Sequence, residues 1–199
     1  MEKNITKAEL IERVNKLDNP IDRFIIVSIF YGLAGESIEG VQILDIKKSD
    51  VNLEENTIKL KDGSVVVMDS LLKKVTVDAM DQEVYVKMGT ISTHTNEDYG
   101  LNPNCPYIIK GKPNKLNDMG MKRLGGQSLK SRLTAISKYL GVSCSRRLLK
   151  QSGIFHMLKE EKTNWTIREA EEFLKKNGLS LRRNNLIEML KEINGEIQK

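Results

Sequence analysis

Residues 24–60 read FIIVSIFYGLAGESIEGVQILDIKKSDVNLEENTIKL, and this stretch decides the fold class. Its nearly uninterrupted apolar start, residues 24–30, is typical of a helix buried in the middle of a core. Asn19 and Pro20 precede it, which favours an N-cap followed by proline at the first helical position, so we expect a helix over 21–33. An apolar stripe over 5–17 predicts a helix before this one. The pattern IEGVQILDI, which follows it, predicts a third, short helix.

The period of the apolar pattern changes after residue 56. TIKL and SVVVM flank Lys61-Asp62-Gly63, which predicts two short antiparallel strands joined by an Asp-Gly turn. Asp69 is expected to cap a helix over 70–80. Residues 89–115 are rich in Asn, Gly, Pro and Thr, so we expect a long loop there with one short strand near 107–109.

The remainder of the chain is predicted to be helical. We expect helices over 116–140, broken or bent near Gly125-Gly126, and over 145–159, 166–176 and 180–192. Thr166 and Glu169 have capping-box spacing, and Asn177-Gly178 is a helix stop. The sequence thus predicts one domain over 1–199, mainly α with a small antiparallel β-sheet (α+β), in which 186–199 form a C-terminal tail.

Length and composition exclude several protein classes. The chain has 199 residues, of which 39% are hydrophobic and 30% charged, values that argue against a disordered or fibrous protein. Two cysteines and two histidines make a zinc site improbable, and no motif indicates a cofactor. We find no signal peptide and no run of about 18 apolar residues, so we expect a cytoplasmic protein with no membrane partner.

Positive charge is concentrated in residues 110–150. This block holds 11 basic side chains and a single acidic one, Asp118, although the net charge of the whole chain is only +5. Clustered cations without competing carboxylates favour nucleic-acid phosphates, because each neutralised phosphate releases counterions. The alternative is a solvated helix face. We favour the nucleic acid because the excess of cations over so short a segment is large.

Helical geometry suggests how these cations are arranged. Leu129, Leu133, Ile136 and Leu140 form the expected buried stripe of the helix over 116–140, with Lys130 and Arg132 on its flanks and Lys138 farther round. Arg146 and Arg147 begin the next helix. The free N–H groups at that position favour an anion, or alternatively are capped by Ser143 or Ser145.

The order of the predicted elements resembles the catalytic domain of the tyrosine recombinases, the phage integrases. Gly32-Leu33-Ala34 stands where that family has Gly-Leu-Arg, and Asp50-Val51 stands where its run into the hairpin begins. The resemblance covers residues 5–190. It implies an integrase-like fold and a DNA partner, and it implies that the family's N-terminal core-binding domain is absent from this chain.

The resemblance also places the family's catalytic positions on other residue types. The first catalytic arginine falls at Ala34, and the His-x-x-Arg box falls on 147–150, where Arg147 and Lys150 stand and the histidine is missing. Lys61 matches the active-site lysine, although a lysine in a surface turn commonly serves solvation. The family attacks a DNA phosphate with a tyrosine near the C-terminus, whereas no tyrosine here lies beyond Tyr139. We therefore expect the chain not to be an enzyme.

Four segments are similar to the master lysogeny repressors of SP-beta-like Bacillus prophages: NPIDRFIIVSIFYGLAG, TIKLKDGSVVVMDSLL, LTAISKYL and LLKQSGIFHMLKE. This resemblance implies a repressor of the lytic cycle of a phage or prophage, associated with the nucleoid of a bacterial host. The residues expected to contact double-stranded DNA are Lys61, Lys122, Arg123, Lys130, Arg132, Lys138, Arg146, Arg147 and Lys150.

The alternative function is a protein interaction module that pairs with a full-length repressor or recombinase. A homo-oligomer formed through the tail, residues 186–199, is one form of it, because members of the family exchange C-terminal elements. The apolar side chains of the tail fit packing on the chain's own core equally well. Both interpretations of the tail stay open on the sequence.

Overall fold

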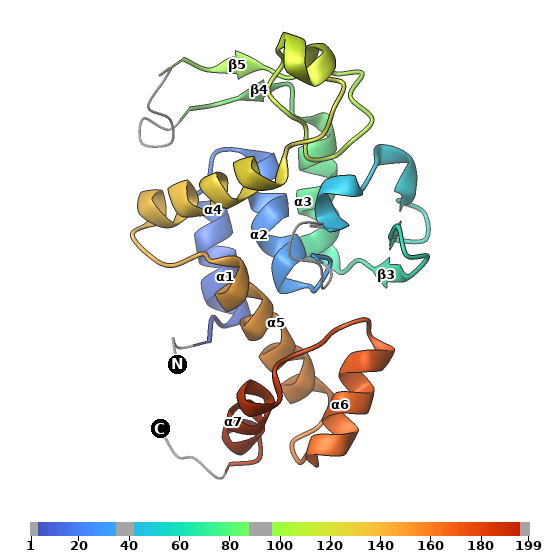
Figure 1. The fold of residues 1–199 in the computed structure, drawn as a ribbon, viewed down its shortest axis with the longest axis vertical. Helices are drawn as coiled ribbons and strands as arrows, with labels where there is room; N and C mark the ends of the chain where they lie inside the picture. The colour runs from blue at the N-terminus through green and yellow to red at the C-terminus, as the bar shows by residue number, and fades with distance from the viewer. Residues whose placement is uncertain (1–3, 35–41, 88–96, 196–199) are drawn as a thin grey trace.

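The computed structural model describes residues 4–34, 42–87 and 97–195, and these are mainly helical with two small antiparallel sheets (Figure 1). This confirms the predicted fold class. The α-helices are α1 (Lys7–Asn15), α2 (Pro20–Phe30), α3 (Ser70–Asp81), α4 (Gly126–Leu140), α5 (Arg146–Glu161), α6 (Ile167–Lys176) and α7 (Arg183–Ile193). The 3-10 helices are η1 (Gln42–Asp45), η2 (Lys48–Asp50) and η3 (Lys115–Gly120). The strands are β1 (Val51–Asn52), β2 (Thr57–Lys59), β3 (Val65–Val67), β4 (Val84–Tyr85) and β5 (Tyr99–Gly100). No helix in the described ranges is both long and apolar enough to cross a membrane.

Helix α2 forms the centre of the larger of two hydrophobic clusters. Its side chains from Ile21 to Phe30 are buried, with the exception of Arg23, and α1, α3 and α5 pack against it. Pro20 begins the helix as predicted, but Asn19 makes no capping hydrogen bond. Its amide instead accepts from the N–H of Val86 at 2.9 Å and donates to the Val86 carbonyl at 2.8 Å. Asn19 therefore ties α2 to the segment that follows β4.

The predicted hairpin forms two strands of the first sheet, whose order is β1-β2-β3. Ile58 lies opposite Val66, and Gly63 in the turn adopts a φ of +86°, which favours glycine. Val51 of β1 lies opposite Ile58 on its other side. Of the short helix predicted from IEGVQILDI, the structure shows η1, and the residues before Gln42 lie outside the described ranges.

The second sheet was not predicted. Strand β4 pairs with β5, which lies inside the loop predicted over 89–115. Tyr85 lies opposite Tyr99, and the two rings stack with 5.1 Å between their centroids. The strand expected near 107–109 is wrong, because Tyr107 makes only an isolated bridge to Lys47. Two-residue strands show too little alternation to appear as a pattern, and side-chain stacking contributes to their pairing.

The helix predicted over 116–140 is divided into η3 and α4. Asp118 and Met119 adopt left-handed φ angles of +50° and +51° at the end of η3, which stops helical continuation. Helix α4 begins at Gly126 and buries Leu129, Leu133 and Ile136, as the stripe predicted.

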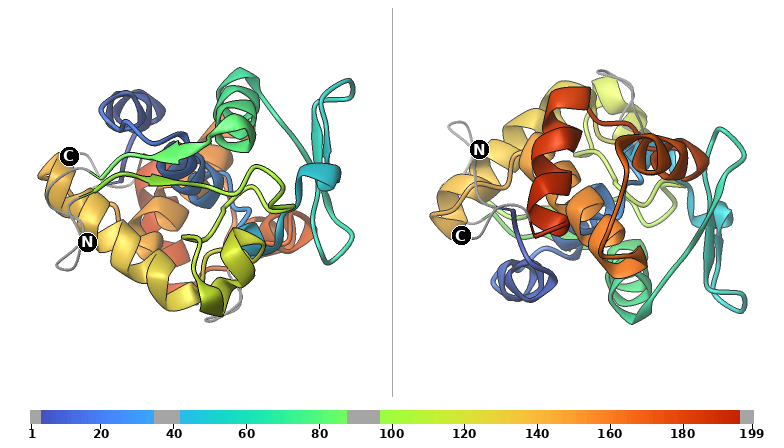
Figure 2. Two further views of the ribbon diagram at one scale, coloured as in Figure 1. Left: turned by 90° about the horizontal axis from the view of Figure 1, so that it is seen from above. Right: turned by 90° about the horizontal axis from the view of Figure 1, so that it is seen from below.

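The second hydrophobic cluster lies at the other end of the molecule, where the C-terminal half of α5 packs with α6 and α7 (Figure 1 and Figure 2, right). Leu186, Met189 and Leu190 of α7 are buried in it. The apolar stripe of the tail therefore packs on the chain's own core. Ile197 lies outside the described residues.

Helix α5 crosses from one cluster to the other and packs against α2, with a close backbone approach at Gly153. A Cβ on Gly153 would lie 1.7 Å from the carbonyl oxygen of Phe30, so a side chain at this position would push the two helices apart. A second close approach joins the end of α2 to the C-terminal cluster. Gly32 faces the side chain of Leu179, which belongs to that cluster.

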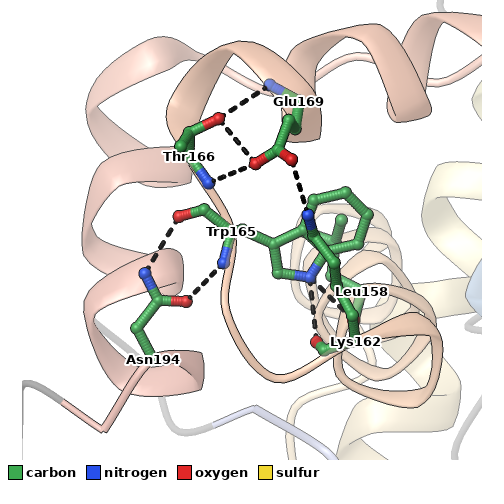
Figure 3. A network of polar contacts seen from close by, with 6 residues as sticks. All are labelled: Leu158, Lys162, Trp165, Thr166, Glu169 and Asn194. Atoms are coloured by element: carbon green, nitrogen blue, oxygen red, sulfur yellow. Dashed lines mark hydrogen bonds and ion pairs between the residues drawn. The ribbon is translucent and has the colours of Figure 1, made fainter.

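A network of hydrogen bonds fixes the connection between α5 and α6 (Figure 3). The indole Nε1–H of Trp165 points at the carbonyl oxygens of Leu158 and Lys162, 3.0 Å from each. Asn194 accepts from the backbone N–H of Trp165 and donates to its carbonyl. Thr166 and Glu169 form the predicted capping box at the start of α6.

Candidate nucleic-acid interface

An open groove of about 650 Å³ lies between the N-terminal turn of α4 and the β4–β5 pair. Among the described residues that line it are five cations and no carboxylate. These cations are Lys87, Lys112, Lys122, Arg123 and Arg132. Gly125, Gln127 and Ser128 from the start of α4 also line the groove, and α4 has no side-chain cap. Because uncapped N–H groups and the helix dipole add positive potential, the groove suits an anionic ligand.

One wall of the groove is aromatic. The stacked rings of Tyr85 and Tyr99 line it, and the Lys112 ammonium lies 5.2 Å from the centroid of the Tyr99 ring. A cation held over a ring face is attracted by the ring quadrupole. This contact keeps the Lys112 charge at the groove.

Arg132 occupies the floor of the groove and not the exposed flank of α4. Only 8% of the residue is exposed, and its guanidinium lies 4.3 Å from the centroid of the Tyr85 ring. Its Nη1 is 3.5 Å from Oδ1 of the fully buried Asp22, while Tyr85 donates a hydrogen bond to the other oxygen of Asp22 at 2.7 Å. Arg132, which the sequence places on the flank of the buried stripe of α4, is thus held inward by Asp22 of α2.

The buried position of Asp22 has consequences for its titration. Burial raises the pKa of the Asp22 carboxyl, and the Arg132 guanidinium and the Tyr85 hydroxyl oppose that rise. Burial also raises the pKa of the Tyr85 hydroxyl. The tyrosine thus stays protonated and donates its hydrogen bond to Asp22 throughout the physiological range.

Lys110, which belongs to the basic block, is also a core residue. It is 1% exposed, and its ammonium donates to the carbonyl oxygens of Met80 and Gln82 at 2.9 and 2.7 Å. Burial lowers the pKa of this lysine. Two of the eleven cations in the block, Lys110 and Arg132, therefore hold the fold together.

Lys61 and Arg123 converge on one carboxylate. Arg123 Nε is 2.6 Å from Oδ1 of Asp45, and Lys61 Nζ is 3.7 Å from its Oδ2. Asp45 thus joins the tip of the predicted hairpin to the edge of the groove. Its charge offsets part of the positive charge that these two residues would offer to DNA.

A second cavity, of about 290 Å³, lies where α5 meets the segment before α7. Arg147, Lys150 and Gln151 of α5 line one side, and Arg182 and Asn185 line the other. The structure thereby brings together Arg147 and Lys150, the two cations that the resemblance to the recombinases places at the His-x-x-Arg box. It adds Arg182, which the sequence interpretation missed.

Arg146 points to Ala34, where the resemblance places the family's first arginine. Its Nη2 donates to the carbonyl oxygen of Ala34 at 3.4 Å, and the Ala34 side chain is buried. The N-terminus of α5 is capped by its own chain, because the Ser145 hydroxyl accepts from the Leu148 N–H at 3.2 Å. The serine cap expected as one alternative at this helix start is therefore present.

Lys130 and Lys138 are exposed on α4 and line neither cavity. The site residues that the sequence missed are Lys87, Lys112 and Arg182. Lys112 is inside the basic block, and Arg182 belongs to an Arg-Arg pair before α7, so charge clustering was a usable signal for both. Lys87 has no such signal, because it reaches the groove only through the unpredicted β4–β5 pair.

Comparison with known proteins agrees with this architecture. A family model described as MrpR, C-terminal catalytic domain, matches residues 4–193. A solved structure titled "Crystal structure of XerA recombinase" is similar to the chain with a TM-score of 0.55 at 15% sequence identity, and the match covers 96% of this chain and 65% of that one. The chain therefore spans just under two thirds of the length of that recombinase, and the likeness is one of fold. No curated protein matches the chain.

Proposed function

The chain belongs to the family of the MrpR C-terminal catalytic domain, and from this premise we propose that it binds double-stranded DNA without cleaving it and represses the lytic genes of a phage or prophage. The integrase-like fold supports a nucleic-acid partner in general terms. The observation that carries the proposal is the groove beside α4, which combines an uncapped helix start with five cations and no carboxylate among its described lining residues. Asp22 and Asp45 offset the charges of two of these cations, Arg132 and Arg123.

The absence of strand cleavage is supported by the residues at the family's catalytic positions. Ala34 has no charge to stabilise a developing phosphorane, and its side chain is buried. The cavity formed by Arg147, Lys150 and Arg182 contains no tyrosine among its lining residues. Its cations suit the binding of a phosphate, whereas the covalent phosphotyrosine step requires a nucleophile.

Mobility shifts of a double-stranded DNA fragment over a series of salt concentrations test DNA binding. We expect the logarithm of the binding constant to fall linearly with the logarithm of the salt concentration, with a slope of about −0.9 for each neutralised phosphate. The variant K112A/K122A removes two groove cations, and we expect it to lower the magnitude of the slope by about 2 and the affinity by about tenfold or more.

A matched control is available at the other end of the molecule. Lys175 and Lys176 are exposed in the last turn of α6, so K175A/K176A removes the same charge away from the groove. Equal losses in both double variants would show that only net charge matters and that the groove is not the interface. No binding by the wild type at the lowest salt concentration would overturn the proposal.

Repression additionally requires sequence preference. Selection from a library of random duplexes, followed by a mobility shift with the enriched sequence, measures it directly. A repressor is expected to bind its operator at least about 10³-fold more tightly than unrelated DNA at the same salt concentration. Salt-sensitive binding with no enriched sequence would retain the DNA-binding proposal and contradict the repressor.

A further inference from the structure

The described surface carries two strongly exposed apolar side chains on a single turn, η3. Leu116 is 91% exposed, the highest value among the large hydrophobic side chains of the described residues, and Met119 on the same turn is 62% exposed. Isolated exposed apolar residues are common, but such complete exposure of a leucine leaves its whole side chain available to a partner.

The turn that displays these side chains is held in place by a set of asparagines. The Asn114 side chain accepts from the N–H of Asn117 at 2.9 Å, and the Asn117 amide in turn donates to the Lys112 carbonyl at 2.8 Å and accepts from the Lys122 N–H at 3.2 Å. Asn102 donates to the carbonyl of Met119 at 3.0 Å. These bonds fix the turn from both sides.

The backbone of η3 is strained as well as fixed. Asp118 and Met119 both adopt left-handed φ angles, which cost energy in residues with a Cβ and persist only where the surroundings impose them. Strain of this kind clusters at functional positions. A strained, hydrogen-bonded turn presents Leu116 in one geometry, so little entropy is lost when a partner binds it.

The position of Leu116 identifies the partner. Leu116 itself lines the cationic groove, together with Lys112 and Lys122, and Lys122 donates to the Leu116 carbonyl at 3.4 Å. The carboxylate of the turn, on Asp118, is not among the lining groups. Protein interfaces are depleted of lysine around their apolar centre, whereas an apolar side chain set among cations suits the stacked bases between two phosphate backbones.

We propose that Leu116 is a wedge that inserts between adjacent base pairs of duplex DNA and bends it while the groove cations hold the phosphates. The inference rests on the proposed function and adds to it a deformation of the DNA. An inserted apolar side chain partly unstacks a base step and kinks the duplex, and the bent DNA then wraps more of the protein surface. Met119 is the second exposed apolar side chain of the same turn.

Ring closure of a short linear duplex tests the wedge without knowledge of the operator. Ligation of the ends of a fragment of about 120 bp is slow because the fragment is shorter than the persistence length of about 150 bp, and a protein that bends DNA accelerates it. We expect the wild-type chain to raise the ring-closure rate about tenfold or more. We expect L116A to lose most of that increase while its affinity stays within about tenfold of the wild type, because the cost of unstacking is lost together with the contact.

Two further variants complete the design. L116M keeps a long apolar side chain and is expected to retain ring closure, and V142A removes an exposed apolar side chain at the far end of α4 and is expected to behave as the wild type. Salt-sensitive binding without accelerated ring closure, or full acceleration by L116A, would overturn the wedge and leave DNA binding intact. No binding at all would overturn both. If L116A changes the oligomeric state in sedimentation and leaves ring closure unaltered, the side chain serves a protein contact and the wedge is wrong.

Discussion

Arg132 of α4 and Asp22 of α2 form an ion pair that lies under the groove, with 3.5 Å between Nη1 and Oδ1 and almost no exposure of either side chain. The pair joins the helix that begins at the groove to the centre of the core. Two stacked tyrosines cover it. The geometry of the groove therefore depends on a charge pair that is almost entirely buried.

Removing one member of this pair should be costly. We expect R132M to lower the free energy of unfolding by about 3–5 kcal/mol, because it leaves the Asp22 charge buried without a partner. Burial raises the pKa of Asp22, and that pKa rises further when Arg132 no longer lowers it. Mild acid therefore protonates the unpaired carboxylate, so the loss of stability should be larger at neutral than at mildly acidic pH. Urea unfolding at several pH values measures both effects. The double variant D22N/R132M should recover much of the stability, and a single variant as stable as the wild type would contradict the role of the pair.

The contact between α2 and α5 gives a second prediction. G153A places a Cβ 1.7 Å from the Phe30 carbonyl oxygen, so we expect a loss of about 3 kcal/mol as the helices separate. G100A is the control, because nothing lies within 4 Å of a Cβ at Gly100 and its φ is not left-handed. Thermal unfolding of both variants is the measurement. Similar melting temperatures for the two would show that α5 shifts freely over α2.

The capping box of α6 predicts a response to acid. Hydrogen bonds from Lys162 and Thr166 lower the pKa of Glu169 from its ordinary value of about 4.5 to about 2. A carboxyl with a lowered pKa in the folded state stabilises the fold above its unfolded value, and that contribution disappears as the pH falls from about 4.5 through about 2. We expect E169Q to flatten the pH dependence of unfolding in this window.

The control for that experiment is E161Q, which changes an exposed glutamate at the end of α5. Its pH profile should follow the wild type. If the free energies of unfolding of E169Q and the wild type fall in parallel between these pH values, protonation of Glu169 does not destabilise the network in Figure 3.

The proposal that the chain does not cleave DNA gives a fourth prediction. Incubation with nicked duplexes that trap a phosphotyrosine intermediate, followed by denaturing electrophoresis, should show no protein-linked DNA strand. The mobility-shift conditions that give binding serve as the positive control for contact. A covalent adduct that disappears when one particular tyrosine is changed to phenylalanine would show that the chain is an enzyme and would reject the proposal.

Long apolar patterns were sufficient to predict much of the fold. The buried run of α2, the hairpin around Gly63 and the capping box of Thr166 and Glu169 are all local features, so their residues carry the information. The β4–β5 pair could not be predicted in this way. It depends on contacts between residues far apart in the sequence. Tyr85 stacks on Tyr99, and Asn19 accepts a hydrogen bond from the N–H of Val86.

The candidate interface was predictable in its charge but not in its detail. Clustering located the basic block, yet helical periodicity placed Arg132 at the edge of the stripe made by Leu129 and Leu133. Which side of that edge it faces is decided by Asp22, a residue of another helix. Lys110 shows the same limit, since its partners are the backbone carbonyls of Met80 and Gln82.

Trp165 is the single tryptophan of the chain and is 6% exposed inside the cluster formed by α5, α6 and α7. Fluorescence excited selectively at tryptophan therefore reports on that cluster alone, while circular dichroism reports on all helices. Coincident transitions of the two signals would mean that the whole chain unfolds as one cooperative unit. Separate transitions would mean that the cluster formed by α5, α6 and α7 unfolds independently of the larger cluster around α2, although α5 contributes to both.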